Sequence, residues 1–273
     1  MKRTIALAPL AILAACGKPP ARGWLGYAEA DQLRIAAPQA GWITHLAVER
    51  GQEVRRGDLL FTLDAEAQVA GEEGGAAATS TARAALAQEE LQHAYLAREL
   101  ARQERLAKTN AGLGAERDAA AHALDLSAAR LATLRTQLAS AEASRRASRY
   151  ALGQRRVVAL ADGRLEEIYF HAGEYVAPAT PVLALLPPAS VRVRFFVPEG
   201  ELARLRVGGR VRIICDGCQP VEAKVSFIAR EAEYTPPVIF SVGNREKLVF
   251  KVEARAAGGL PLHPGQPVEV RPL

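Results

Sequence analysis

The sequence predicts a mixed α/β, multi-domain and elongated protein, in which a β-sandwich is split by a long α-helical coiled-coil hairpin and followed by a small antiparallel β-barrel. Three observations carry this prediction: an internal repeat of short β-type segments, a helix-forming stretch between its two copies, and a C-terminal third rich in alternating strands. A chain of 273 residues with 49% hydrophobic and 24% charged residues has the composition of a folded protein with one to three modules.

The N-terminal residues have the pattern of a lipoprotein signal peptide, which we assign to residues 1–15. Two basic residues precede an apolar run from Ile5 to Ala15, which suits a signal-peptide core and is too short to span a bilayer. The following Leu13-Ala14-Ala15-Cys16-Gly17 resembles a lipobox. This resemblance implies lipidation of Cys16 and a lipid-anchored linker over residues 16–34, whereas the alternative is an ordinary secretion signal with a chance cysteine.

Two copies of one pattern lie 122 residues apart in the sequence (163 − 41 = 173 − 51 = 122). Each copy has short β-type runs separated by glycines, with apolar residues at alternating positions, which predicts half-buried strands and tight turns. Neither copy is large enough to hold a core alone. We therefore expect residues 35–64 and 154–187 to face each other in one compact sandwich.

Both copies resemble the half-motifs of the lipoyl and biotinyl carrier fold. Such carriers present a modified Lys on a tight hairpin between the two halves. The equivalent run here is Asp64-Ala65-Glu66-Ala67-Gln68, in which Ala67 takes the place of the Lys. Because the sequence has no Lys between Lys18 and Lys108, we expect no attached cofactor.

Residues 65–153 replace that tight hairpin and predict two long helices, because they lack Pro and are rich in strong helix formers. The second half has a coiled-coil seam of leucines at heptad spacing. Residues 71–75, with three glycines, predict a break or kink in the first arm, and residues 110–114 predict the tip. Each arm beyond the break would be about 50 to 60 Å long. A helix pair packed back on a globular domain would instead need a broad apolar face.

Residues 188–273 change to alternating strands separated by Gly, Pro and Asp, which predicts the small antiparallel barrel. Within it, Cys215 and Cys218 flank Asp216-Gly217, a strong hairpin-turn signal that would place both cysteines on facing strand ends. Three interpretations stay open: a disulfide, two unpaired thiols, or a metal or redox site. The last interpretation lacks a second ligand pair, since the five His residues form no spaced partner motif.

The order of these parts resembles the HlyD-type periplasmic adaptors, or membrane fusion proteins. The barrel residues that carry the resemblance are residues 207–211 and 263–268, and residues 215–218 and 231–237 resemble the lipoprotein branch associated with ABC-2 type exporters. The resemblance implies a periplasmic subunit of a tripartite efflux or secretion system, anchored by lipid at the inner membrane. Its partners would be an inner-membrane transporter of ABC type, an outer-membrane duct protein and further copies of the chain in a ring.

A tip pattern of adaptor families also has counterparts in this chain. The pattern is an Arg, a Leu four residues later and a Ser seven residues after that, and it meets the duct. Arg102, Leu106 and Leu113 take these places, so that two of the three residues match. The resemblance implies a partner-binding tip. In the alternative interpretation, Arg102 lies on a solvated face and Leu106 belongs to the helix seam.

Other functional classes find little support in the sequence. There is no nucleophile with its base, carboxylate pair, phosphate loop or metal cluster at a recognisable spacing, so we expect neither an enzyme nor a metal protein. The arginines are dispersed among Ala and Glu, which argues against nucleic-acid binding. The remaining alternative is an envelope scaffold or solute-binding lipoprotein without a transporter partner.

Overall fold

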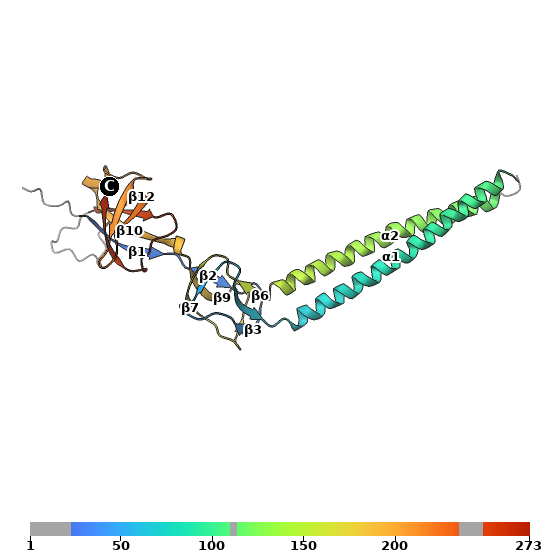
Figure 1. The fold of residues 1–273 in the computed structure, drawn as a ribbon, viewed down its shortest axis with the longest axis horizontal. Coiled ribbons are helices and arrows are strands. Elements are labelled where there is room, and N and C mark those ends of the chain that lie inside the picture. The colour runs from blue at the N-terminus through green and yellow to red at the C-terminus, as the bar shows by residue number, and fades with distance from the viewer. Residues whose placement is uncertain (1–22, 110–113, 235–247) are drawn as a thin grey trace, which may run out of the picture. The chain divides into compact units, whose positions relative to one another are not determined.

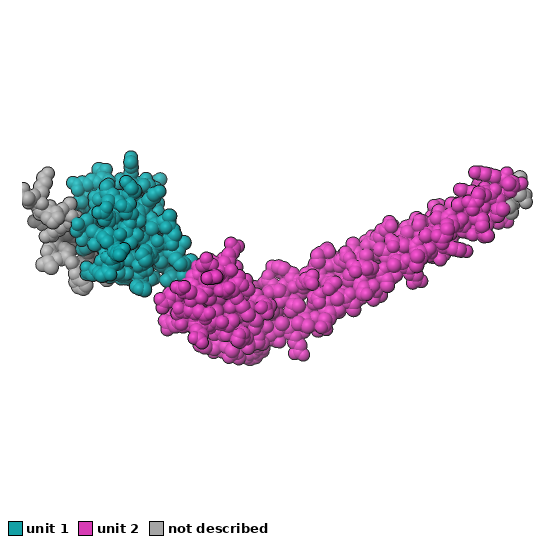
Figure 2. Space-filling model, in the orientation of Figure 1, with its two compact units in different colours: residues 1–32, 186–273 teal, residues 33–185 magenta. Residues whose placement is uncertain are grey.

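The computed structural model describes residues 23–109, 114–234 and 248–273 (Figure 1). The chain divides into two compact units, which are coloured separately in Figure 2. Met1–Gln32 and Leu186–Leu273 form the first, here called the barrel unit, and Leu33–Leu185 forms the second, here called the hairpin unit. The first described residues, from residue 23 to residue 32, and the C-terminal part of the chain therefore share one unit, and the hairpin unit is inserted between them in the sequence.

The hairpin unit contains a sandwich of two four-stranded sheets, with strand orders β2-β9-β7-β4 and β6-β5-β3-β8. A shift of 122 residues maps each strand of one sheet onto a strand of the other, so that both sheets mix strands from the two copies of the repeat. The strands are β2 (Leu33–Ala36), β3 (Gly41–Leu46), β4 (Glu53–Val54), β5 (Leu59–Leu63), β6 (Arg156–Val158), β7 (Gly163–Ile168), β8 (Tyr175–Val176) and β9 (Pro181–Leu186).

Equivalent residues of the two copies fill the sandwich core in pairs. Ile43 and Leu165 are both buried, and so are the pairs Val54 and Val176, Leu60 and Val182, and Leu63 and Leu185. Backbone hydrogen bonds are duplicated in the same way, because the amide of Gly51 donates to the carbonyl of Leu165 and that of Gly173 to Ile43, both at 2.8 Å. The two-copy sandwich predicted from the repeat is confirmed.

Helices α1 (Glu66–Ala107) and α2 (Gly114–Gly153) are inserted between β5 and β6 and lie side by side, which confirms the predicted hairpin (Figure 1). The predicted break at residues 71–75 is wrong, since α1 continues through it. A Gly inside a helix costs only about 1 kcal/mol relative to Ala. Gly75 also has a packing role, because a Cβ there would lie 3.2 Å from the Cα of Arg145.

The barrel unit is a closed antiparallel barrel with the strand order β1-β10-β13-β12-β11-β14. Apolar residues that alternate along these strands point inward and form its core, with Val193, Phe195, Ile213 and Val252 completely buried. Its elements are β1 (Trp24–Ala30), η2 (Pro188–Ser190), β10 (Val191–Pro198), α3 (Glu199–Leu202), β11 (Arg210–Ile214), β12 (Val221–Tyr234), β13 (Leu248–Arg255) and β14 (Pro267–Pro272).

Strand β1 lies within residues 16–34, which we had expected to be a linker. It pairs with β10 and β14 and thereby closes the barrel, and its Trp24 and Ala28 are buried in the barrel core. The segment is short, and its partner strands lie more than 150 residues later in the chain. Its local pattern therefore did not distinguish a strand from a linker.

An ionic cluster joins β1 to β10 and β13. Arg192 is buried and donates to the carboxylate of Asp31, and its guanidinium lies 3.2 Å from Glu29 and 3.4 Å from Glu253. The hydrogen bond from Arg192 lowers the pKa of Asp31, against a smaller opposing effect of burial. A buried guanidinium needs such partners, because an unpaired buried charge is strongly unfavourable.

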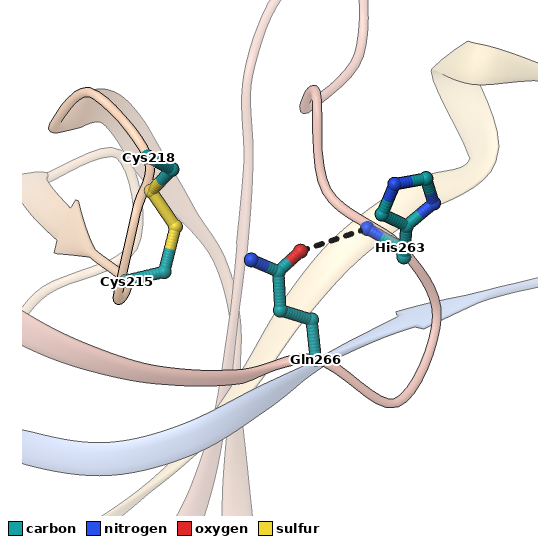
Figure 3. The surroundings of a disulfide bond; sticks show 4 residues. All are labelled: Cys215, Cys218, His263 and Gln266. Carbon is teal, nitrogen blue, oxygen red and sulfur yellow. Dashed lines mark hydrogen bonds between the residues drawn. A yellow bond between two sulfur atoms is a disulfide. The ribbon is translucent and has the colours of Figure 1, made fainter.

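Cys215 and Cys218 form a disulfide in the connection between β11 and β12 (Figure 3). Cys215 is buried in the barrel core, and Gly217 in the turn has φ = 78°, a conformation that favours glycine. The strands end at Ile214 and Val221. The cysteines therefore lie in the loop rather than on facing strand ends. In a nearby loop, the amide of His263 donates to Oε1 of Gln266 at 3.0 Å (Figure 3).

Two equivalent turns of the sandwich provide a test of backbone strain. Gly57 has φ = 95°, and its repeat equivalent Ala179 has φ = 61°. The left-handed region costs a non-Gly residue roughly 1 kcal/mol or more, so Ala179→Gly should raise the free energy of unfolding by up to about 1 kcal/mol after the entropy of Gly is offset. Gly57→Ala should lower it by about 1 kcal/mol. Urea denaturation of both variants measures the two changes, and a loss of stability in Ala179→Gly would contradict this reasoning.

The disulfide predicts a redox-dependent chemical reactivity. Protein isolated from an oxidising compartment should not be alkylated at Cys215 or Cys218 until a reductant is added, as intact mass spectrometry would show. Because the closed loop is very short, its entropic stabilisation is small, and reduction should lower the melting temperature only slightly. Alkylation of both thiols without reductant would rule the disulfide out for the isolated protein.

Candidate docking site on the helical hairpin

The seam between α1 and α2 follows a heptad pattern in both helices. In α2 it contains the predicted leucines, of which Leu131 is the most buried. The α1 heptads were not recognised from the sequence, because most of their members are small or polar. The α1 seam residues are Glu72, Gly75, Thr79, Ala82, Leu86, Glu89, His93, Leu96, Leu100, Gln103 and Ala107, and those of α2 are Ala120, Leu124, Ser127, Leu131, Leu134, Leu138, Ala141, Arg145, Ser148 and Leu152.

Polar contacts interrupt this seam at several levels. The guanidinium of Arg145 lies 3.0 Å from the carboxylate of Glu72. The hydroxyl of Ser127, which is buried, donates to Glu89 at 2.6 Å. These contacts satisfy polar groups that would otherwise lose hydration without compensation. The two helices are thus held by small side chains and polar layers as well as by leucines.

The described end of the hairpin presents Arg102 and Leu106 on one face of α1. Residues four apart are neighbours on a helix surface, so the two side chains form one patch. Leu106 is 44% exposed. The seam residues at this level are instead Gln103 and Ala107, so the structure places Leu106 outside the seam.

Arg102 is oriented by a carboxylate one turn earlier in α1. Its guanidinium lies 2.7 Å from Glu99, which also accepts a hydrogen bond from the amide of Gln103 at 2.8 Å. The hydrogen bond from Arg102 lowers the pKa of Glu99, and Glu99 in turn raises the pKa of Arg102. Exposed pairs of this kind contribute little to stability. The pair does restrict the guanidinium, which keeps further N–H donors for a partner.

The other residues singled out from the sequence do not join this patch. Leu113, the third residue of the tip pattern, and Cys16, the lipidation site, lie outside the described residues. Cys215 and Cys218 belong to the barrel unit. Of the sequence-derived site, the structure therefore brings together Arg102 and Leu106.

Metal-ligating side chains do not gather anywhere in the described parts of the chain, where no three His, Cys, Asp or Glu residues are grouped so as to hold an ion. Ala67, the position of the carrier Lys, lies in the first turns of α1. Among the described residues, no helix is both long and apolar enough to cross a membrane.

One exposed feature of the sandwich was not anticipated from the sequence. Trp42 of β3 and Tyr175 of β8 are cross-strand partners with ring centroids 5.4 Å apart, and each is more than half exposed. Their repeat equivalents, Arg164 and Glu53, are also cross-strand partners. The repeat alignment already contained this signal, because equivalent surface positions are aromatic in one sheet and charged in the other.

Comparison with known proteins connects part of the chain to a curated relative. No family model matches the chain. The UPF0194 membrane protein in asrC 5'region of Acidithiobacillus ferridurans is 32% identical over 145 residues, which make up 51% of this chain and 42% of the relative. The chain thus matches less than half the length of that protein.

Solved structures share the fold over most of the chain. MacA from Actinobacillus actinomycetemcomitans superposes with a TM-score of 0.71 at 19% identity, covering 91% of this chain and 76% of MacA. The membrane fusion protein Spr0693 from Streptococcus pneumoniae R6 has a TM-score of 0.61 at 16% identity, covering 91% and 97%. A putative efflux transporter from Bacteroides eggerthii has a TM-score of 0.56 at 18% identity, covering 92% and 68%. The chain therefore has the fold of the membrane fusion proteins, as its resemblance to HlyD-type periplasmic adaptors predicted.

Proposed function

We propose that this chain is a periplasmic adaptor subunit of a tripartite efflux or secretion system, which links an inner-membrane transporter to an outer-membrane duct. The observation that carries the proposal is the hairpin itself, inserted between the halves of the sandwich with Arg102 and Leu106 exposed near its end. The 42 residues of α1 give it a length of about 60 Å. The fold shared with the membrane fusion protein Spr0693 supports the same function.

The patch of Arg102 and Leu106 suits a contact with another protein. An exposed Leu outside the seam contributes little to the packing of its own hairpin. At a protein interface, Arg and large apolar side chains contribute most when a partner excludes water from them. A duct that covers this patch would bury Leu106 and accept hydrogen bonds from Arg102.

The proposed lipid anchor lies close to the barrel unit in sequence. Trp24, where β1 begins, lies eight positions after Cys16 in the sequence, and an extended chain of that length spans at most about 30 Å. A lipidated Cys16 would thus hold the barrel unit near the inner membrane. Residues 215–218 and 231–237, which resemble the branch associated with ABC-2 type exporters, favour an ABC-type transporter as the partner there.

In this proposal the chain performs no chemical step. It holds two membrane proteins in register, and several copies arranged in a ring would surround the path of the exported substrate. Mild crosslinking followed by identification of the copurified membrane proteins tests this function directly. Recovery of neither a transporter nor a duct protein would favour a scaffold or solute-binding lipoprotein instead.

The exposed Leu at the tip predicts a selective loss of function. Leu106→Asp should abolish crosslinking to the duct and export, because the carboxylate would be buried without a partner in the contact, at a cost of several kcal/mol. The melting temperature of the purified protein should change little, since this side chain is 44% exposed in the free chain. Unchanged export would refute the tip assignment, and a large fall in melting temperature would show that Leu106 supports the helix pair.

The matched control for this experiment is Leu91→Asp. Leu91 lies on the same helix, is 75% exposed and precedes Leu106 by fifteen residues. The same chemical change there should leave both duct crosslinking and export intact. Equal defects in the two variants would indicate a general effect of charge on α1 and would contradict a local contact.

The lipobox resemblance predicts the fate of the N-terminal cysteine. Labelled palmitate should enter the wild-type protein and not Cys16→Ala, because the substitution removes the sulfur that accepts the lipid. The Cys16→Ala precursor should also stay uncleaved at the lipoprotein site. Incorporation of equal label into both proteins would refute lipidation at Cys16.

A further inference from the structure

Charge is divided unevenly between the two helices at the sandwich end of the hairpin. From residue 66 to residue 75, α1 carries three Glu and neither Lys nor Arg, whereas residues 145–153 of α2 carry three Arg and neither Asp nor Glu. The two stretches lie at the same level of the hairpin. Arg145 contacts both the carboxylate of Glu72 and the backbone region of Gly75, which fixes this alignment.

Among the described residues, one pair of these charges is neutralised, that of Glu72 and Arg145. The side chains of Glu66, Glu73, Arg146 and Arg149 are exposed, and none has an ion-pair partner among the residues that the structure describes. They form two separate surfaces. We call Glu66 and Glu73 the acidic face of α1, and Arg146 and Arg149 the basic face of α2.

Each face is a coherent surface: the acidic face lies on the outer side of α1, and the basic face borders the seam on α2. Glu66 and Glu73 are seven residues apart, so they lie on one side of α1 about 10 Å from each other, and Arg146 and Arg149 are neighbours on one side of α2. Glu73 and Arg146 each directly follow a seam residue. Since one residue turns the helix by about 100°, both lie outside the seam.

The surroundings of the basic face contain an excess of positive charge. A cavity of about 180 Å³ is lined by Arg146 and Arg149 together with Thr79, Arg83, Glu142 and Arg145. Its one carboxylate, Glu142, is already engaged by Arg83 at 3.2 Å. The basic face therefore has N–H donors for which the described residues of its own chain provide no carboxylate partner.

We infer that the acidic face of α1 docks against the basic face of α2 in a second copy of this chain, with the two hairpins side by side and pointing in the same direction. Rotation about an axis parallel to the hairpins keeps every residue at its level. Glu73 of one copy then meets Arg146 of the next without any sliding of one hairpin along the other. A small anion would neutralise the basic face and leave the charge of the acidic face without a partner. A second copy neutralises the charges of both faces.

This contact is head-to-tail, because its two surfaces come from different helices. Every added copy leaves one acidic and one basic face free, so a finite assembly without free faces has to close as a ring. The inference rests on the proposed adaptor function, and it names the residues through which neighbouring copies would meet.

Charge reversal on the full-length protein in detergent tests the contact. One variant combines Glu66→Arg with Glu73→Arg, and the other combines Arg146→Glu with Arg149→Glu. Each variant alone sets like charges against each other, so we expect self-association at low salt to weaken about tenfold or more in analytical ultracentrifugation. Wild-type association should also weaken as salt is raised.

An equimolar mixture of the two variants is the decisive measurement. In the mixture, the basic α1 of the first variant meets the acidic α2 of the second, and the acidic α1 of the second meets the basic α2 of the first. Alternating copies therefore restore complementary charge at every contact. We expect association of the mixture to return to within a few-fold of the wild-type value.

A control variant carries Glu116→Arg and Arg130→Glu, two exposed positions of α2 outside both faces, and should associate like wild type. Circular dichroism and melting curves verify that all variants are folded.

The inference is overturned if folded variants associate as tightly as wild type, or if the mixture associates as weakly as its components. It is also overturned if Arg146→Glu with Arg149→Glu abolishes binding of inorganic phosphate without affecting association. Absence of transporter and duct crosslinks would remove the adaptor function while leaving a charge-dependent contact between copies in place.

Discussion

The antiparallel pairing of β5 with β6 holds both ends of the helical hairpin at one place. Phe61 lies opposite Val157, and the amide of Leu63 donates to the carbonyl of Arg155 at 2.8 Å. The chain between these strands, residues 64–155, leaves the sandwich and returns to it, and closing a flexible loop of that length would cost about 4 kcal/mol. Burial of repeat-related apolar residues on both sheets offsets this cost. The sandwich is therefore the anchor that allows a long helical pair to exist outside any globular core.

That anchor explains how the hairpin forms with a modest seam. Of the described residues in the two helices, Leu131 is the one large apolar side chain that is buried. Half-buried leucines, the close approach at Gly75 and the hydrogen bond between Ser127 and Glu89 also contribute to the seam. Polar residues in a coiled-coil seam favour one register at some expense of stability. A defined register places each exposed charge of α1 at a known level relative to α2, which is the property that a side-by-side contact between copies requires.

In the duplicated sandwich, equivalent core positions are similar in the two copies, whereas equivalent surface positions differ. In the core, equivalent positions such as Ile43 and Leu165 are both apolar, since each must fill the same kind of space between the sheets. At the surface, the aromatic partners Trp42 and Tyr175 correspond to a charged pair. Packing constrains the interior of both copies equally, whereas the two outer surfaces have diverged in chemistry.

The sequence by itself determined the order of the parts, the two-copy sandwich, the helical pair and the α2 seam, because glycine spacing and apolar periodicity are local signals. Tertiary structure decided the rest. Strand β1 is paired with β10 and β14, which follow it by more than 150 residues. Helix α1 continues through residues 71–75, where Gly75 packs closely against Arg145 of α2. The face occupied by Leu106 became visible only once the polar heptads of α1 were seen against α2. Such outcomes depend on contacts between residues distant in the chain, whose energies no short window of sequence contains.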